Sequence, residues 1–439
     1  MATGMKKVLI ITYYWPPGAG AGVQRWLKFA KYLREFGWEP VIYTPANPES
    51  PEQDPSLLKD LPTGVQVIRR RIREPYRLFR WFTGQPAGSK FQPGFLNESD
   101  SPGIKHRLAT WLRGNLFIPD ARKWWVTPSV RFLSGWLPHH PVHALVSTGP
   151  PHSMHLIALH LKKKLGLPWL ADFRDPWTQI DFYHKLMLSP AADRRHHVLE
   201  KRVLQSADQV VAVTRQNAES LARIAGREVV VVTNGFDPDD YEGLPGYDHK
   251  LFTITHLGSM NADRNPLALW KVLQELLEED PRWKEFLRIR LIGKTDVSVQ
   301  EAIRRNRLAG QTETIRYLPH DRALAEASRS ALLLLPLNRV PHAGGIATGK
   351  LYEYLALDRP ILCIGPPDGE AARIIEDTGA GSTADFEGED RLGKVLKGHF
   401  EAFLQKQLVR PRADITAYSR RELAGRMAGL LDRVSNKTG

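Results

Sequence analysis

The sequence predicts an α/β protein built from two doubly wound domains, each with a parallel sheet between layers of helices. Short apolar runs alternate with amphipathic helical patterns along the chain, as expected for parallel strands that are buried on both faces. The length of 439 residues is too great for one hydrophobic core and suits two domains of roughly 200 residues each.

Six apolar runs in the first half are expected to be strands, and helical patterns follow several of them. The runs are residues 7–12, 40–44, 65–69, 144–147, 169–171 and 209–213, with helices at 23–36, 152–165 and 192–205. Residues 74–136 break the alternation, because prolines, glycines and aromatic residues interrupt any regular period there. We expect this segment to leave the sheet and to form a surface.

The second half repeats the plan after residues 237–250, whose prolines, glycines and acids are typical of a linker. Its expected strands are residues 252–257, 287–292, 315–318, 331–335 and 360–364. We therefore expect a first domain over residues 1–236 and a second over residues 251–414. In doubly wound domains, ligands bind beyond the carboxyl ends of the strands.

The composition limits the class of the protein. A content of 42% hydrophobic and 25% charged residues is ordinary for a globular chain. No apolar run approaches the roughly 20 residues that cross a bilayer, and the N-terminal residues lead into a strand instead of a signal sequence. We therefore expect a cytoplasmic protein. The single cysteine, Cys363, excludes an internal disulfide and a cysteine metal cluster, and we expect no metal site.

The positive charge is concentrated in the first half. Residues 1–236 hold 32 Lys and Arg against 18 Asp and Glu, whereas the remainder holds 29 against 30. The basic residues of the segment that leaves the sheet lie among Trp, Tyr and Phe, a mixture that suits an anionic membrane surface. They are Arg69, Arg70, Arg71, Arg73, Arg77, Arg80, Lys105, Arg107, Arg113, Arg122 and Lys123. We expect peripheral attachment to the inner face of the cell membrane and no nucleic acid partner; nucleic acid binding and a solvated basic face are the alternatives.

A glycine-rich loop before a helix is the most informative motif. Such a loop directs unpaired backbone N–H groups and the positive end of the helix dipole at one place, while Lys350 and Glu353 share one face of the helix. The arrangement suits a diphosphate with hydroxyls beside it. Leu351 stands where a P-loop needs a Ser or Thr for Mg²⁺, which argues against that motif, and a purely structural junction is the alternative. The residues expected to bind are Gly344, Gly345, Ile346, Ala347, Lys350 and Glu353.

The first strand is followed by a second flexible turn that contains Gly20 and Gly22. The glycine spacing does not fit a dinucleotide fingerprint, and the second strand ends without a ribose-binding acid, so NAD is not expected. What remains is an anion-binding turn.

These motifs together resemble glycosyltransferase family 4. Glu353, before an Ala-containing helix and an apolar strand, matches the family's ribose-binding Glu, but the Glu that the family keeps eight residues earlier is replaced by Gly345. The resemblance implies the GT-B architecture, two doubly wound Rossmann-like domains facing across a cleft, with a closing helix over residues 415–434 that packs back on the first domain. It also implies a metal-independent, retaining hexosyltransferase. The donor would be a nucleotide-diphosphate sugar, with no other cofactor, and the acceptor a cell-surface polysaccharide or a lipid-linked glycan.

The resemblance also suggests roles for residues that follow other strands. Arg264 and Lys294 match basic positions that bind the diphosphate, where two positive groups offset the charge of the leaving group. His320 lies in the loop that would read the nucleobase. The turn with Gly20 and Gly22 would close over the donor. An exposed loop charge is the alternative for Lys294, and a helix start is the alternative for His320.

The acceptor-binding site is predicted from two segments that follow strands of the first domain. His152 begins a helix and could donate to a sugar hydroxyl or to the leaving group, while Asp172, Arg174 and Asp175 could orient an acceptor hydroxyl or its phosphate. We expect His152 and Asp175 to be catalytic; purely structural roles are the alternative. Two other functions stay open. A nucleotide-sugar 2-epimerase needs acids near the sugar, and a non-enzymatic basic binding protein would not need Glu353 or Arg264.

Overall fold

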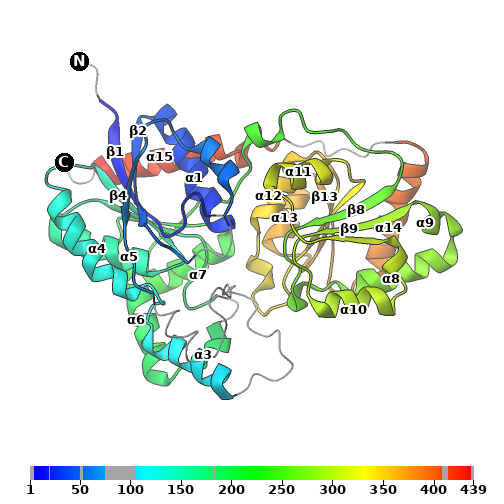
Figure 1. Ribbon diagram of the computed structural model, residues 1–439, viewed down its shortest axis with the longest axis horizontal. Helices are drawn as coiled ribbons and strands as arrows, with labels where there is room; N and C mark the ends of the chain where they lie inside the picture. Colours follow the sequence, from blue (N-terminus) through cyan, green and yellow to red (C-terminus); the bar gives the residue numbers. More distant parts are fainter. Residues whose placement is uncertain are drawn as a thin grey trace. The chain divides into compact units, whose positions relative to one another are not determined.

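The computed structural model describes residues 4–18, 20–49, 53–74, 104–180, 183–407 and 414–436. The chain divides into two compact units (Figure 1). Unit 1 consists of Met1–Thr233 and Arg420–Gly439, and unit 2 consists of Asn234–Ser419. Residues 237–250, expected as a linker, are thus counted with unit 2, and the helix expected to close the chain is counted with unit 1. Within the described residues, no helix is both long and apolar enough to span a membrane.

Unit 1 is built on a seven-stranded sheet in which every neighbouring pair of strands is parallel. The order is β3-β2-β1-β4-β5-β6-β7, so the chain winds outward in both directions from β1. The strands are β1 (Lys6–Ile11), β2 (Trp38–Pro45), β3 (Gln66–Arg70), β4 (Ala144–Gly149), β5 (Trp169–Phe173), β6 (Gln209–Ala212) and β7 (Val230–Val231). The doubly wound prediction is confirmed, and all six expected apolar runs are strands.

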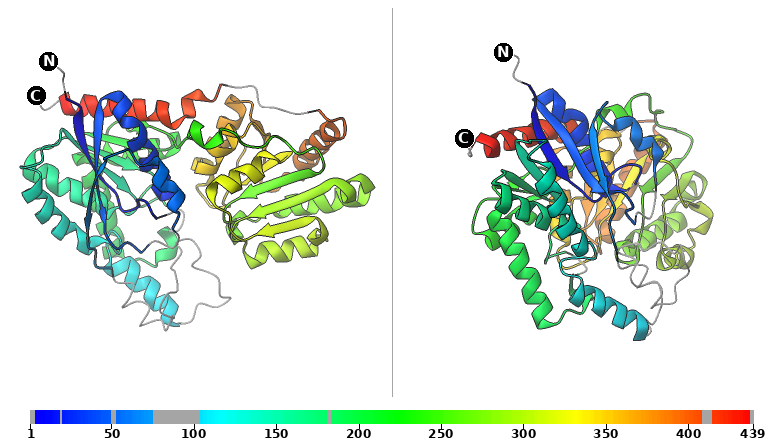
Figure 2. Two further views of the ribbon diagram at one scale, coloured as in Figure 1. Left: turned by 45° about the horizontal axis from the view of Figure 1, so that its top comes forward. Right: turned by 60° about the vertical axis from the view of Figure 1, so that its left-hand side comes forward.

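Helices cover both faces of this sheet (Figures 1 and 2). Side chains alternate along a strand, so Val8 and Ile10 enter one core whereas Leu9 and Ile11 enter the other. Helices α1 (Ala21–Leu33) and α15 (Arg420–Asn436) supply the first core. Helices α4 (Lys123–Trp136), α5 (Ser153–Leu165), α6 (Pro190–Ser206) and α7 (Arg215–Ala225) supply the second.

Residues 74–136 were expected to leave the sheet, and their described part does so, but it is largely helical, although the sequence showed no regular period there. This part contains α3 (Ile104–Leu116) and α4, and the remainder of the segment, residues 75–103, lies outside the described residues. In α4, Trp125, Ser129 and Leu133 form a buried stripe with a spacing of four residues. Pro128 and the exposed aromatic Trp124 interrupt the sequence pattern of that stripe. The helical period was therefore hidden by residues on the outer face.

Unit 2 has a six-stranded parallel sheet in the order β10-β9-β8-β11-β12-β13. The strands are β8 (Phe252–Leu257), β9 (Leu287–Ile292), β10 (Thr312–Ile315), β11 (Leu332–Pro336), β12 (Ile361–Ile364) and β13 (Gly381–Ala384). One face is covered by α8 (Leu267–Glu279), α9 (Pro281–Phe286), α10 (Val297–Arg305) and α14 (Glu389–Leu404). The other is covered by α11 (His320–Ser328), α12 (Gly349–Ala356) and α13 (Glu370–Asp377). This sheet is also doubly wound, as predicted.

The strand expected at residues 315–318 is wrong in its position, because the strand ends at Ile315. β10 is an edge strand with polar residues, and its Glu313 accepts a hydrogen bond from Arg290 Nε of β9 at 2.8 Å. An edge strand needs no continuous apolar run, since one side of it faces solvent. For the same reason the sequence did not indicate the edge strand β13. The edge strand β7 was also missed, although it lies within four consecutive valines, residues 229–232.

Candidate functional site

Four of the segments that the sequence singled out lie at the carboxyl edge of the unit 2 sheet. They follow β8, β9, β10 and β11, and the last of them leads into α12. In a parallel sheet this edge gathers the loops and the N-termini of the helices, so it is where ligands bind. Tyr354 of α12 fixes the helix there, because its buried hydroxyl accepts a hydrogen bond from Leu257 N, the last residue of β8, at 2.8 Å.

Lys350 packs onto the loop that follows β8. A methyl group built on Gly258 would lie 2.8 Å from Lys350 Nζ, and Gly258 has a φ of 96°, so the position favours glycine for two reasons. Burial, and next the nearby charge of Arg264, lower the pKa of Lys350 to about 7. The lysine is thus held where a second positive group opposes its charge. A bound anion would relieve both the burial and the repulsion.

Arg264 is fixed by the same loop. Its Nη1 donates to the carbonyl oxygen of Ser259 at 2.9 Å, and its backbone N donates to Asn261 O at 3.0 Å. His256 of β8 is buried, and its pKa is lowered to about 3 by burial and by the charge of Lys350, so the ring is neutral at physiological pH. The ring bonds through Nδ1 to the carbonyl oxygen of Leu334 at 2.9 Å. His256 therefore adds no positive charge to those of Arg264 and Lys350.

Lys294 lies in the neighbouring loop, after β9. Its carbonyl oxygen accepts from Met260 N at 2.9 Å, which joins the loops after β8 and β9. Gly293 allows this approach, because a methyl group there would lie 2.9 Å from the Cα of Gly258. The structure therefore brings the Arg264 and Lys294 loops together, while Lys294 itself stays half-exposed.

Glu353 lies one turn of α12 beyond Lys350 and meets His320 of α11. Its Oε1 is 3.3 Å from His320 Nε2, and the two side chains are 28% and 27% exposed. Both groups are thus oriented by each other and still accessible to a ligand. A carboxylate in this setting can accept hydrogen bonds from a pair of hydroxyls.

The glycine-rich loop supplies the backbone of the site. A 3₁₀ turn, Ala343–Gly345, precedes α12, and in this turn the N–H groups of Gly345 and Ile346 donate to His342 O and Ala343 O at 3.0 Å. Two of the amides expected to face a donor are thus engaged in the turn itself. Thr348, the N-cap residue of α12, makes no side-chain cap, and its buried Oγ1 has no partner among the described residues. The first turn of α12 therefore begins without a side-chain cap.

In unit 1, His152 lies after β4, just before α5. Its ring stacks on Trp177 at 4.7 Å with an interplanar angle of 7°, and it is only 7% exposed. Burial, followed by the charges of His155 and Arg174, lowers its pKa well below the ordinary value. His152 is therefore a neutral imidazole at physiological pH. Its Nδ1 is directed toward Gly149, where a methyl group would lie 3.0 Å from it.

Arg174, which follows β5, joins the loops after β1 and β4 at the carboxyl edge of the unit 1 sheet, and its Nη2 donates to Pro150 O of the loop after β4. Its Nη1 donates to Gly22 O of α1 at 3.1 Å, and its guanidinium lies over the Tyr14 ring at 5.5 Å. A methyl group on Gly22 would lie 2.8 Å from Tyr14 Cδ2, so glycine leaves room for this packing. Gly20, the N-cap of α1, has a φ of 98°. The neighbouring Asp175 is exposed.

The expectation that Asp172 orients an acceptor is wrong. Asp172 is fully buried and forms a salt bridge of 2.8 Å with Arg25 of α1. It also accepts hydrogen bonds from Trp26 Nε1 at 2.7 Å and from Thr148 Oγ1 at 2.9 Å. The Asp172 carboxylate thus binds residues that hold α1 on the sheet, and it does not face a ligand. No sequence signal indicated this, because Arg25 and Asp172 are 147 residues apart.

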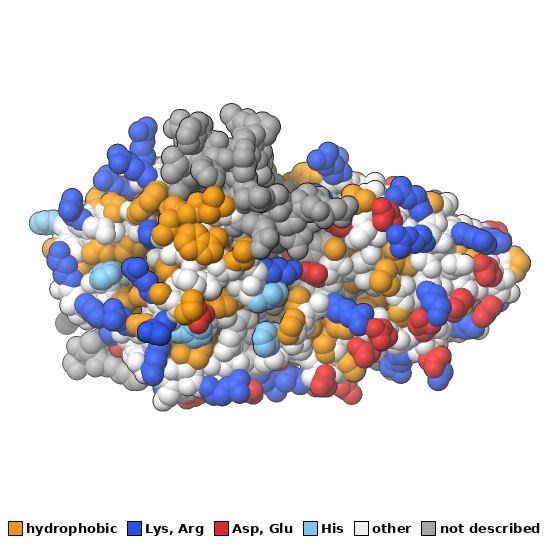
Figure 3. All heavy atoms as spheres, turned by 90° about the horizontal axis from the view of Figure 1, so that it is seen from below, with side chains coloured by type: hydrophobic (Ala, Val, Ile, Leu, Met, Phe, Trp, Pro, Cys, Tyr) orange, Lys and Arg blue, Asp and Glu red, His pale blue; other side chains and the backbone are white. Residues whose placement is uncertain are grey.

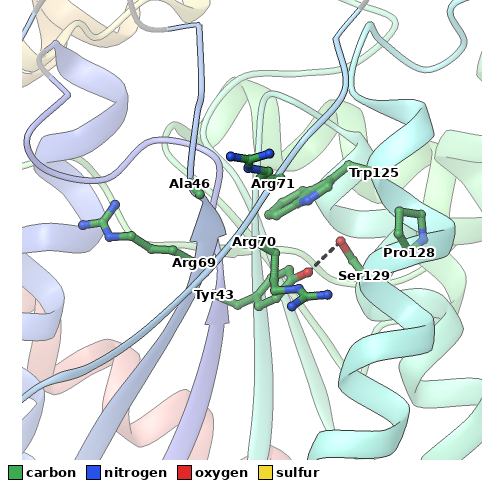
Figure 4. A pocket seen from close by; sticks show the side chains of 8 residues that line it. All are labelled: Tyr43, Ala46, Arg69, Arg70, Arg71, Trp125, Pro128 and Ser129. Atoms are coloured by element: carbon green, nitrogen blue, oxygen red, sulfur yellow. Dashed lines mark hydrogen bonds between the residues drawn. The ribbon is translucent and has the colours of Figure 1, made fainter.

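A pocket that the sequence did not predict lies at the ends of β2 and β3 (Figure 4). Three consecutive arginines contribute to its lining, and the basic run itself was visible in the sequence. The pocket was not, because α4 contributes residues about 60 positions away. The lining residues are Tyr43, Ala46, Arg69, Arg70, Arg71, Trp125, Pro128 and Ser129.

Comparisons with known proteins agree with this architecture. Residues 20–235 match the family model of the glycosyl transferase 4-like domain. No curated protein sequence matches the chain. Similar folds are found in sucrose-phosphate synthase from Thermosynechococcus elongatus, with a TM-score of 0.58, 10% identity, and coverage of 99% of this chain and 97% of that chain. WaaG, a glycosyltransferase involved in lipopolysaccharide biosynthesis, has a TM-score of 0.53 and 15% identity, and 98% of each chain is covered.

An epimerase candidate shares the fold as well. A candidate UDP-N-acetylglucosamine 2-epimerase from Listeria monocytogenes has a TM-score of 0.54 and 11% identity, with 99% of this chain and 98% of that chain covered. At such identities the likeness shows the fold. The chain therefore has the glycosyltransferase-like GT-B fold of two Rossmann-like domains, and residues 20–235 match the glycosyl transferase 4-like domain.

Proposed function

We propose that the protein transfers a hexose from a nucleotide-diphosphate sugar to a glycan or lipid-linked acceptor. The observation that carries the proposal is the group formed by Lys350, Arg264 and Glu353 around Gly258. It combines two positive charges with a half-exposed carboxylate one helical turn away. A nucleoside diphosphate presents the complement, two phosphates followed by ribose hydroxyls. The family match of residues 20–235 supports the same class of reaction.

In this proposal the donor diphosphate binds beside Arg264, Lys294 and Lys350. Negative charge grows on the diphosphate as the bond to the sugar breaks, and positive groups that are already in place stabilise that charge. Glu353 accepts hydrogen bonds from the ribose, and His320 lies beside the base. The Gly20–Gly22 turn would close over the donor.

The acceptor would bind to unit 1, near His152 and Asp175. The neutral ring of His152 could donate to a sugar hydroxyl, and the exposed Asp175 could orient the attacking hydroxyl. We further propose transfer with retention and without a metal ion, with the leaving diphosphate helping to deprotonate the acceptor. Both features rest on the family resemblance.

The first test is binding of nucleoside diphosphates to the full chain. A ligand at about 100 times its dissociation constant stabilises the folded protein by about 2.7 kcal/mol, so a thermal-shift screen identifies the base. The matching nucleotide sugar is then supplied with Arg264→Gln and Lys294→Gln. Turnover should fall more than nucleoside binding, because both charges act on the diphosphate. Wild-type activity should persist in EDTA; a strict need for a divalent ion contradicts metal independence.

A nucleotide-sugar 2-epimerase is the second candidate, because a candidate 2-epimerase shares the fold. The two activities give different products from the same nucleotide sugar. A transferase releases the nucleoside diphosphate when an acceptor is present, whereas the epimerase returns an isomeric nucleotide sugar. Chromatography of the nucleotide products separates these outcomes.

We also propose that unit 1 attaches to an anionic membrane surface. Four large apolar residues are exposed on α3 and near the start of α4: Leu108, Trp111, Leu116 and Trp124. On the face drawn in Figure 3, acidic side chains gather over unit 2, whereas mainly basic and hydrophobic ones are seen over unit 1. The protein should sediment with vesicles of acidic lipid and dissociate as salt rises. Equal sedimentation with neutral vesicles contradicts this proposal.

A further inference from the structure

The pocket at the ends of β2 and β3 has a volume of about 300 Å³. All of its lining residues belong to unit 1, and none of them is acidic. Its wall is firmly held. The ring of Tyr43 stacks on Trp125 at 5.0 Å with an interplanar angle of 15°, and Tyr43 OH donates to Ser129 Oγ at 2.9 Å. All three side chains are buried. Burial raises the pKa of Tyr43 to about 12, so its hydroxyl stays neutral at physiological pH.

The arginines of the pocket are exposed and have no carboxylate partner among the described residues. Arg69 Nη2 donates to Pro16 O at 3.0 Å, and Arg70 lies over the Phe132 ring at 4.5 Å. In Figure 4, the guanidinium groups of Arg70 and Arg71 flank the Tyr43–Trp125 pair, while Arg69 points away from it. The arginines therefore place positive charge beside the packed Tyr43–Trp125 pair, and no acidic residue of the pocket lining neutralises it.

Two other arginines of unit 1 do have acidic partners. Arg122 pairs with Glu74 at 2.9 Å, and Arg34 pairs with Glu39 at 2.7 Å. The charges of these two arginines are thus balanced within the protein. Guanidinium groups that line a pocket without a carboxylate partner suit a phosphate, because each fork can donate two hydrogen bonds to phosphate oxygens.

The position of the pocket suggests which phosphate it binds. In the sheet, β2 and β1 lie between β3, which ends at Arg70, and β4, and His152 follows the end of β4 by three residues. With strands about 4.8 Å apart, three spacings put the ends of β3 and β4 about 14 Å apart. A phosphorylated glycan can span that distance, and 300 Å³ is at the lower end of ligand-pocket volumes.

We propose that this pocket binds the phosphate group of the acceptor, so that the acceptor is a phosphorylated sugar or a glycan with a phosphate at one end. Binding would place its free sugar toward His152, with the phosphate at the arginine-lined wall of the pocket. The acceptor role rests on the proposed function, whereas phosphate binding by the pocket does not. A lipid headgroup offers the same chemistry, and the experiment separates the two sources.

The test uses a fluorophore beside the pocket and pyrophosphate as the probe. Thr127 is exposed on α4 between Trp125 and Ser129, and the native Cys363 is buried, so Thr127→Cys gives one reactive thiol. Pyrophosphate should change the fluorescence of the labelled full chain with saturation. Arg70→Gln and Arg71→Gln should each weaken this response about tenfold to a hundredfold, since each removes a charge-assisted contact. Arg131→Gln, an exposed arginine of the same helix, should leave it unchanged.

Additional measurements separate acceptor phosphate from lipid headgroups and check that the variants are folded. Glu353→Ala should leave the pyrophosphate response intact, so a failed donor site and a failed pocket are distinguishable. Melting curves of the labelled variants check that each one folds. Equal pyrophosphate responses in Arg70→Gln, Arg71→Gln and wild type overturn the proposal. A response to phosphatidate vesicles but none to pyrophosphate also overturns it and assigns the arginines to the membrane.

Discussion

Lys350 of α12 lies against the backbone of Gly258, and this contact joins the glycine-rich loop to the loop after β8. A side chain at Gly258 would occupy the place of the lysine, since a methyl group would be 2.8 Å from Nζ. A larger residue at position 258 would therefore force the end of the Lys350 side chain to move away from this loop. Arg264, held by Ser259 O in the same loop, adds the second positive charge.

Gly258→Ala tests this contact. The φ of 96° strains an alanine by about 1–2 kcal/mol, and the new methyl group displaces the lysine side chain. We expect lower thermal stability together with weaker binding of the nucleoside diphosphate, measured by calorimetry. Lys350→Met should weaken binding without the backbone strain. Gly310→Ala is the control, because a methyl group there meets nothing within 4 Å; equal behaviour of the two alanine variants would count against the contact.

The pH dependence of donor binding tests the charge of Lys350. Its pKa is lowered from 10.5 to about 7, so the folded apo protein binds fewer protons than the unfolded chain between these values. Stability should therefore rise with pH across this window. A bound diphosphate raises the lysine pKa, so binding at pH about 8 should take up a proton, since the phosphate's own last pKa is about 6.

Calorimetry in buffers of different ionisation enthalpy measures this proton uptake. Wild-type protein should show uptake that approaches one proton for each nucleotide bound, and Lys350→Met should show none. Uptake of the same size in Lys350→Met would assign the proton to another group.

Glu353 offers the clearest test of ribose recognition. Glu353→Ala should remove a charge-assisted hydrogen bond of roughly 1.5–3 kcal/mol, which weakens donor binding about tenfold to a hundredfold. His320→Ala should have a smaller effect, since it removes a partner that orients the carboxylate at 3.3 Å. Glu376→Ala, an exposed acid of α13, is the matched control. Unchanged donor affinity in a folded Glu353→Ala protein would remove this residue from the site.

The sequence predicted the parts of the structure that local patterns encode. Buried strands such as β11 and β12 were found because they are continuous apolar runs, and Lys350 and Glu353 were paired because they lie three positions apart on one helix. The edge strand β10 was misplaced because one side of it needs no apolar residues. The Arg70–Arg71 pocket was missed because its wall joins β2 to α4, and neither segment indicates the other. Interactions of this kind depend on how distant elements pack.

The buried pair of Arg25 and Asp172 gives the strongest stability prediction. Burial alone would raise the pKa of Asp172, but Arg25 and the hydrogen bond from Trp26 prevail and lower it. The stabilisation is therefore complete above the ordinary carboxyl pKa of 3.8 and is lost as the pH falls through the lowered value. Asp172→Ala leaves the guanidinium buried without its partner, which should cost about 3–5 kcal/mol.

Hydrogen exchange of the β4 and β5 amides follows unit 1 alone and measures this loss. Exchange of these amides should accelerate strongly in Asp172→Ala at neutral pH. Glu219→Gln, an exposed acid of α7, should change the free energy of unfolding by no more than about 0.5 kcal/mol. If Asp172 instead oriented an acceptor, Asp172→Ala would lower turnover while exchange in β4 and β5 stayed at the wild-type rate. The salt bridge of 2.8 Å and the full burial of both side chains predict the opposite pattern, early loss of the fold of unit 1.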